Sequence, residues 1–158
     1  MSTIYILKQK GYDIMIEKDT VRLLRECDAG AKMGISTIEE TMQFSLSEPL
    51  KKILEHSREQ HLEMSRKINE RLARFSDDGK DPPMMAELMG KVKANFRMVT
   101  EETDKAAADL ISDGCSMGIR SLSKYLNEYK AAEEYSKDIA KKLIAIEDRL
   151  SVELRSFL

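Results

Sequence analysis

The sequence predicts an all-α protein made of two helical hairpins, with an extra helix in the connection that joins them. Glycine and proline are scarce, with seven and three residues among 158. A β sandwich or barrel needs turn residues about every 8–12 positions, so an all-β fold is excluded. Apolar residues instead recur at steps of three and four, which is the spacing of one face of a helix.

The first hairpin is predicted at 17–75. Its first helix, at about 17–44, carries the helical stripe from Val21 to Met42, and its second, at about 49–75, carries it from Leu50 to Phe75. Pro49 marks the break between the two helices, since proline is accepted in the first turn of a helix.

The strongest loop signal is SDDGKDPP at 76–83, which divides the chain nearly in half. One helix over the next 46 residues would be about 69 Å long, so we expect a break near 100–104, where Thr and Asp favour helix caps. The predicted organisation is an N-terminal arm at 1–16, a first hairpin at 17–75, a loop at 76–83, an extra helix with its connection at 84–102, and a second hairpin at 103–158.

The conformation of residues 1–16 stays open from the sequence. The apolar runs that start at Ile4 and Ile14 flank Lys10 and Gly11, which is compatible with a small hairpin or with an arm packed on the bundle. A lone two-stranded hairpin is marginal in water.

Charge and composition exclude several classes of function. Twenty-six basic against 28 acidic residues leave a net charge of −2, so no basic field is available for nucleic acid. No apolar run approaches the roughly 20 residues that span a membrane, and the first residues lack the pattern of a secretion signal. Cys27 and Cys115 lie far apart without zinc-site spacing, so we expect free thiols and a cytoplasmic protein.

An internal repeat is the most specific motif. The pattern Gly-x-x-Met-Gly-Ile begins at Gly30 and again at Gly114, so that Gly34 and Gly118 also correspond. Each glycine inside a helix costs about 0.8–1 kcal/mol relative to alanine. We expect the four glycines to form bare notches through which the first and third long helices cross closely. The alternative is a flat ligand bound in the notch.

Two stretches carry a resemblance to a known group: AKMGISTIEETM at 31–42, and residues 110–158, which include LISDGCSMGIRSLSKYLNEY and KKLIAIEDRLSVELRSFL. They resemble uncharacterised bacterial ferritin-like four-helix-bundle proteins without an assigned activity. The resemblance covers about 28–158. It implies two helical hairpins joined by a crossover that can hold an extra helix.

The ligand set of ferritin-like di-iron enzymes is incomplete in this chain. Such enzymes place one Glu on each of two helices and Glu-x-x-His on each of the other two. The chain has two histidines, His56 and His61, and neither has Glu three residues earlier. Leu150 also stands where Glu147 would need a histidine partner. This pattern argues against a di-iron oxidase and predicts no cofactor.

His61 and Glu147 remain weak metal-ligand candidates. Both fall at corresponding positions of the two hairpins, 86 residues apart, so they can face each other across the core. The alternatives are a metal ligand and a buried His–Glu pair without metal. A buried pair predicts that His61 gains a proton more easily than free imidazole.

The sequence therefore predicts a non-enzymatic helical-bundle protein that acts by self-association or by binding another protein. A homodimer is expected only because symmetric dimers are the commonest soluble oligomers. The alternatives are a degenerate metal-binding bundle and a small-ligand binder at the glycine notch, and no nucleic-acid or membrane partner is expected.

Overall fold

The computed structural model describes residues 2–83, 85–97 and 103–158, and the described residues contain helices and loops but no strand. The predicted all-α class is confirmed. The elements are α1 (Thr3–Thr41), α2 (Glu48–Ala73), α3 (Met85–Arg97), α4 (Thr103–Glu128), α5 (Glu134–Glu153) and a final 3-10 turn, η1 (Leu154–Phe157).

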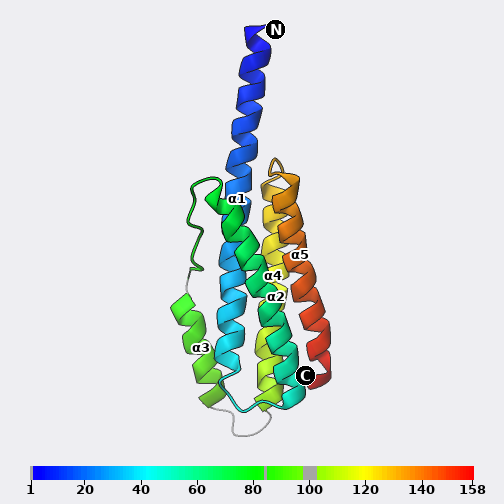
Figure 1. The fold of residues 1–158 in the computed structure, drawn as a ribbon. Helices are drawn as coiled ribbons and strands as arrows, with labels where there is room; N and C mark the ends of the chain where they lie inside the picture. Colours follow the sequence, from blue (N-terminus) through cyan, green and yellow to red (C-terminus); the bar gives the residue numbers. More distant parts are fainter. Residues whose placement is uncertain (1, 84, 98–102) are drawn as a thin grey trace.

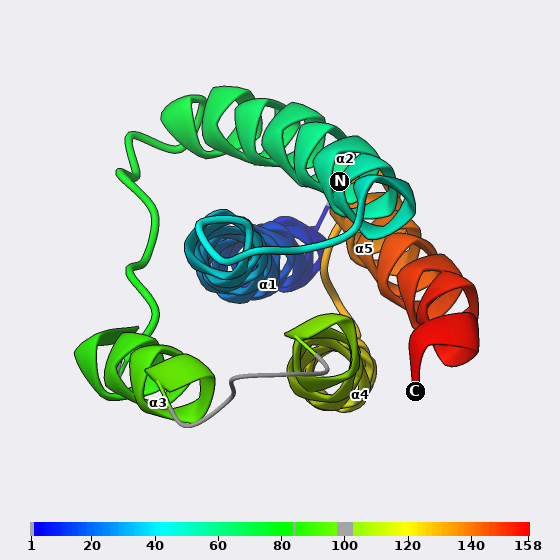
Figure 2. The ribbon, with the colours of Figure 1, turned by 90° about the horizontal axis from the view of Figure 1, so that it is seen from below.

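Two antiparallel hairpins, α1–α2 and α4–α5, lie side by side, and α3 lies in the connection between them (Figures 1 and 2). The predicted extra helix is therefore present as α3. The predicted break near 100–104 falls partly on 98–102, and the extra helix was expected to begin at residue 84; these residues lie outside the described part of the chain.

The buried apolar side chains form two clusters along the bundle. The first, toward the end from which α1 projects, includes Leu23, Ile68 and Leu143. The second, toward the opposite end, includes Ile38, Leu54 and Leu150. In the second cluster Phe96 of α3 is buried and stacks on Phe44 with ring centroids 4.1 Å apart, so the extra helix adds to the core.

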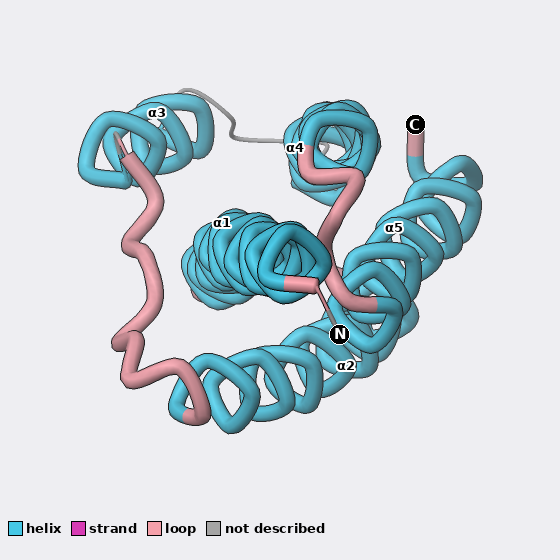
Figure 3. The backbone as a smooth tube through the Cα atoms, turned by 90° about the horizontal axis from the view of Figure 1, so that it is seen from above, coloured by secondary structure: helices cyan, strands magenta, loops and turns pink. Residues whose placement is uncertain are grey.

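The N-terminal arm differs from both structures considered for residues 1–16. The helix α1 begins at Thr3, with Ser2 as its N-cap, and continues without a break into the bundle. Its N-terminal part projects alone beyond the other helices (Figure 1), and Figure 3 looks down α1 from this projecting end. The hairpin and the packed arm are both wrong, because this proline-free segment simply extends the helix, and Gly11 alone costs only about 1 kcal/mol there.

No helix among the described residues combines the length and the apolar character needed to cross a membrane.

Candidate functional site

A polar layer lies inside the bundle and takes one residue from each of four helices. These are Gly34 of α1, His61 of α2, Gly118 of α4 and Glu147 of α5. The Nε2 atom of His61 lies 2.6 Å from Oε1 of Glu147, so the predicted approach of the two side chains is present. The exposed fraction is 1% for the His61 side chain and 13% for Glu147.

Both ring nitrogens of His61 are engaged. Nδ1 lies 2.8 Å from the backbone oxygen of Ser57, one helical turn earlier. A carbonyl oxygen can only accept, so Nδ1 carries a hydrogen and donates it to Ser57. At Nε2 the 2.6 Å contact with Glu147 suits an imidazolium ring that donates to a carboxylate, because both ring nitrogens then act as donors.

The environment raises the pKa of His61 above its ordinary value. Burial acts in the opposite direction, because it disfavours the charged ring. The hydrogen bond to Glu147, the charge of that carboxylate and the hydrogen bond to Ser57 together outweigh burial. The direction agrees with the expectation for a buried pair.

The glycines do not serve the predicted close crossing of helices. A methyl group added at Gly30 or at Gly114 would meet nothing within 4 Å, so both positions face open space. At Gly34 the added carbon would lie 2.8 Å from Cδ2 and Nε2 of His61, and at Gly118 it would lie 3.6 Å from the carboxyl carbon of Glu147. The expectation of four crossing glycines is therefore wrong: the second glycine of each copy makes room for the His–Glu pair.

The notch at Gly34 and Gly118, which was the alternative site for a flat ligand, is filled by side chains of the protein itself. The space beside Gly34 is taken by the imidazole of His61, and the space beside Gly118 by Glu147.

Cys115 borders the polar layer, and Cys27 lies in the first apolar cluster. Burial, followed by the charge of Glu147 and a hydrogen bond with its carboxylate, raises the pKa of the Cys115 thiol. Burial and the neighbouring carboxylates of Glu26 and Asp28 raise the pKa of Cys27 to about 12. Thiols that stay protonated are poor nucleophiles and poor metal ligands.

The layer does not fit a di-metal centre. Such a centre needs a carboxylate from each of four helices and two histidines. Here α1 and α4 contribute only Gly34 and Gly118, and His61 already uses both nitrogens. Across the described ranges, no three His, Cys, Asp or Glu side chains gather as ligands of one ion.

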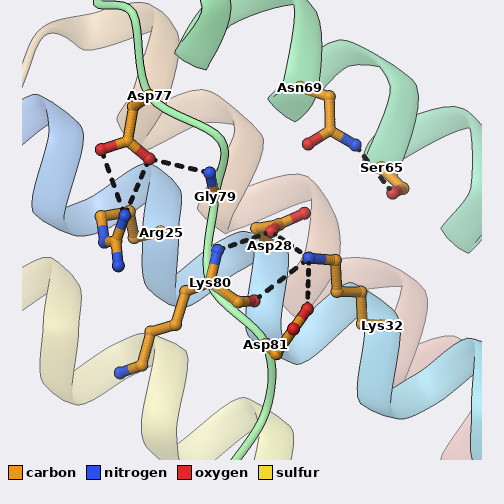
Figure 4. A network of polar contacts seen from close by, with 9 residues as sticks. All are labelled: Arg25, Asp28, Lys32, Ser65, Asn69, Asp77, Gly79, Lys80 and Asp81. Atoms are coloured by element: carbon orange, nitrogen blue, oxygen red, sulfur yellow. Dashed lines mark hydrogen bonds and ion pairs between the residues drawn. The ribbon is translucent and has the colours of Figure 1, made fainter.

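A second polar cluster, missed by the sequence analysis, fastens the loop at 76–83 to α1 (Figure 4). Asp28 is fully buried, and its Oδ2 accepts from the backbone nitrogen of Lys80 at 2.9 Å and pairs with Nζ of Lys32 at 2.8 Å. Arg25 donates to Asp77 at 2.9 Å. Gly79, with φ +88°, lies against the Asp28 carboxylate, where a side chain would collide.

One stripe of α1, called the seam below, follows alternating steps of three and four residues. Its members are Ile4, Leu7, Gly11, Ile14, Lys18, Val21, Arg25, Asp28 and Lys32. The loop at 76–83 covers the seam at Arg25, Asp28 and Lys32. The loop leaves the seam uncovered from Ile4 to Val21, where its residues from Ile4 to Lys18 are exposed and Val21 is half-buried against the first apolar cluster.

The projecting part of α1 displays a large apolar surface. Its exposed apolar side chains each keep 53–67% of their surface accessible: Ile4, Tyr5, Ile6, Leu7, Tyr12, Ile14 and Met15. Contiguous apolar surface of this kind marks sites of interaction. The two apolar runs that start at Ile4 and Ile14 could have indicated this surface, but only if both had been assigned to one helix.

Comparisons with protein-family models, with characterised proteins and with solved structures give no match for this chain.

Proposed function

We propose that this protein acts by self-association through the projecting part of α1, without catalysing a reaction. The exposed apolar surface at Ile4, Leu7 and Ile14 carries the proposal. These residues lie on one helical face with coiled-coil spacing, which suits a second helix.

Association is favoured because it removes exposed apolar side chains from water. Full burial of a large apolar side chain stabilises by about 1.5–3 kcal/mol relative to exposure. An arm with seven such side chains at 53–67% exposure leaves that free energy unused in an isolated chain. A helix of about 16 residues is also marginal by itself in water, so a covering partner stabilises the arm as a helix.

The test is the mass of the full-length protein in solution. Sedimentation equilibrium at micromolar concentration should give twice the 18.1 kDa of one chain. The variant with Leu7→Glu and Ile14→Glu should sediment as one chain while its bundle still unfolds cooperatively on heating. A single-chain mass for the unaltered protein over the whole concentration range contradicts self-association and leaves a different protein as the partner.

We further propose that the chain is ferritin-like. Two antiparallel hairpins with a helix in their connection, and a polar pair in the middle of the bundle, support this kinship. The residues at Gly34 and Gly118 stand where a di-metal bundle would need ligands, which favours a bundle without metal chemistry.

The competing metal-binding proposal rests on His61 and Glu147. Metal analysis of the purified protein, beside a His61→Gln variant, distinguishes the two proposals. Stoichiometric metal that is lost in His61→Gln would support the metal-binding bundle, whereas equal trace metal in both proteins supports the metal-free one.

A further inference from the structure

We infer that the covering partner is a second copy of this chain whose projecting helix lies antiparallel, with the two free seams overlapping from Ile4 to Val21. The inference rests on the proposed self-association and specifies its geometry. It is carried by the limits of the free seam, by the residues that meet along it and by the placement of charge.

The free seam, which is the part that the loop at 76–83 leaves uncovered, runs from Ile4 to Val21, and Val21 itself is half-buried against the first apolar cluster. Beyond Val21 the loop covers Arg25 and Asp28. An antiparallel partner that covers the whole free seam must set Ile4 of one copy beside Val21 of the other. The overlap is 18 residues, or about 27 Å of helix.

This register gives complementary contacts in the seam. Leu7 lies opposite Lys18 of the second copy, whose aliphatic stem can cover it while the ammonium reaches water. Gly11 lies opposite Ile14 of the second copy, so a position without a side chain receives a bulky one. A methyl group at Gly11 would meet nothing within 4 Å in the single chain, which leaves that space for the second copy.

Charge supports the same direction. Lys10 and Glu17 flank the seam, and both are exposed. In an antiparallel pair these flanking positions face each other across the seam, so Lys10 meets Glu17 of the second copy twice by symmetry.

The parallel arrangement is disfavoured on three counts. It sets Lys18 against Lys18 and leaves Gly11 opposite Gly11, which makes a repulsive contact and a gap. It also brings the two bundles alongside each other at the level of Asp28, where each seam is already covered by its own loop at 76–83.

Disulfide trapping tests the geometry. The exposed positions Leu7 and Lys18 each receive a cysteine in separate chains, Leu7→Cys and Lys18→Cys, which are mixed and oxidised. The buried native thiols at Cys27 and Cys115 serve as the background in the unaltered protein, which should form no cross-link. The antiparallel pair predicts a disulfide between the two different variants.

The matched control is Leu7→Cys alone. In the antiparallel pair the two copies of position 7 are about 16 Å apart along the axis, well beyond the reach of a disulfide. A strong disulfide in Leu7→Cys alone would overturn the proposal in favour of a parallel pair. No disulfide in the mixture, although sedimentation shows a dimer, would overturn the geometry and leave self-association standing. A single-chain mass would overturn both.

A charge exchange provides an independent test without cysteines. Lys10→Glu should raise the dimer dissociation constant about fivefold, because two exposed ion pairs become repulsive. Adding Glu17→Lys to the same chain should restore the original constant. In a parallel pair Lys10 lies nearest Met15, so failure of the second change to rescue the first contradicts the antiparallel arrangement.

A last control concerns the face of the helix. Tyr12 lies on the same projecting segment but outside the seam, and it is similarly exposed. Tyr12→Glu should leave the mass of the dimer unchanged. Dissociation by Tyr12→Glu and not by Leu7→Glu would place the contact on the wrong side of α1 for this proposal.

Discussion

The N-terminal part of the seam on α1, from Ile4 to Val21, and its C-terminal part, from Arg25 to Lys32, differ in what covers them. In the C-terminal part, Arg25, Asp28 and Lys32 are charged, and the loop at 76–83 supplies their partners. In the N-terminal part, Ile4, Leu7 and Ile14 are apolar, and nothing in the described part of the chain covers them. Where the loop covers the seam, the side chains are charged and paired with the loop, although Oδ1 of Asp28 has no hydrogen-bond partner among the described residues. The uncovered apolar stripe is the one that can bind a second chain.

The largest effect expected separates the bundle from the arm. His61→Ala removes one partner of a buried pair and leaves Glu147 without its counter-charge. The free energy of unfolding should fall by about 3–5 kcal/mol. Urea unfolding measures it, with Leu7→Ser as the control.

In that control, unfolding is followed at concentrations where the chain is dissociated. Leu7 then has no partner, so the change should stay within about 0.5 kcal/mol. A large loss in Leu7→Ser under these conditions would mean that the arm is held by the bundle of its own chain, and the comparison of the two parts would fail.

The next effect sharpens the role of the loop. Gly79→Ala places a side chain at a positive φ and against the Asp28 carboxylate. We expect a loss of about 2–3 kcal/mol, since the strained backbone and the displaced loop add together. Thermal unfolding measures the loss, and Gly30→Ala, at an open position of α1 outside the proposed contact with a second copy, is the matched change. Equal losses at the two glycines would contradict the role of Asp28 in fastening the loop at 76–83 to α1.

The first and second glycines of the motif predict changes of opposite sign in the free energy of unfolding. Gly34→Ala should lower the free energy of unfolding by about 1–2 kcal/mol, because the ring of His61 is fixed on both sides and must move. Gly30→Ala and Gly114→Ala should raise it by about 0.5–1 kcal/mol, since both face open space inside a helix. Denaturant unfolding distinguishes the two. Stabilisation by Gly34→Ala would mean that His61 is not held as described.

The smallest effect is a dependence on pH. Burial disfavours the protonated ring of His61, but Glu147 and Ser57 outweigh it and raise the pKa. The stabilisation from this group is complete below the pKa of histidine in the unfolded chain, about 6.5, and is lost as the pH rises through the folded-state pKa. As the pH rises above about 6.5, the melting temperature should therefore fall more steeply than in His61→Gln. Parallel profiles for the two proteins would contradict the raised pKa.

The helices and the His–Glu pair could be predicted because each depends on a repeating pattern. Burial of one face imposes steps of three and four residues, and the offset between the hairpins put His61 opposite Glu147. The glycine motif led to the wrong expectation of a close helix crossing, because a position without a side chain indicates only that some other group lies close to the backbone there. The sequence does not tell whether the approaching group is a backbone or the ring of His61.

The contact between Asp28 and the loop at 76–83, and the projecting arm, could not be predicted from the sequence, because neither depends on a local repeating pattern. Asp28 owes its partner to the path of a loop some 50 residues later, which no local pattern fixes. Among the described residues nothing packs on the exposed arm, so tertiary contact could not decide between the conformations considered for residues 1–16.

Hydrogen exchange of the arm amides as a function of protein concentration tests the central claim most directly. Self-association through the projecting part of α1 predicts that the amides of residues 4–18 exchange slowly at high concentration and much faster on dilution. Amides in the bundle, such as those around His61, should exchange at the same rate throughout. Arm amides that exchange at one rate at every concentration, equal to that in the Leu7→Glu and Ile14→Glu variant, would contradict the account.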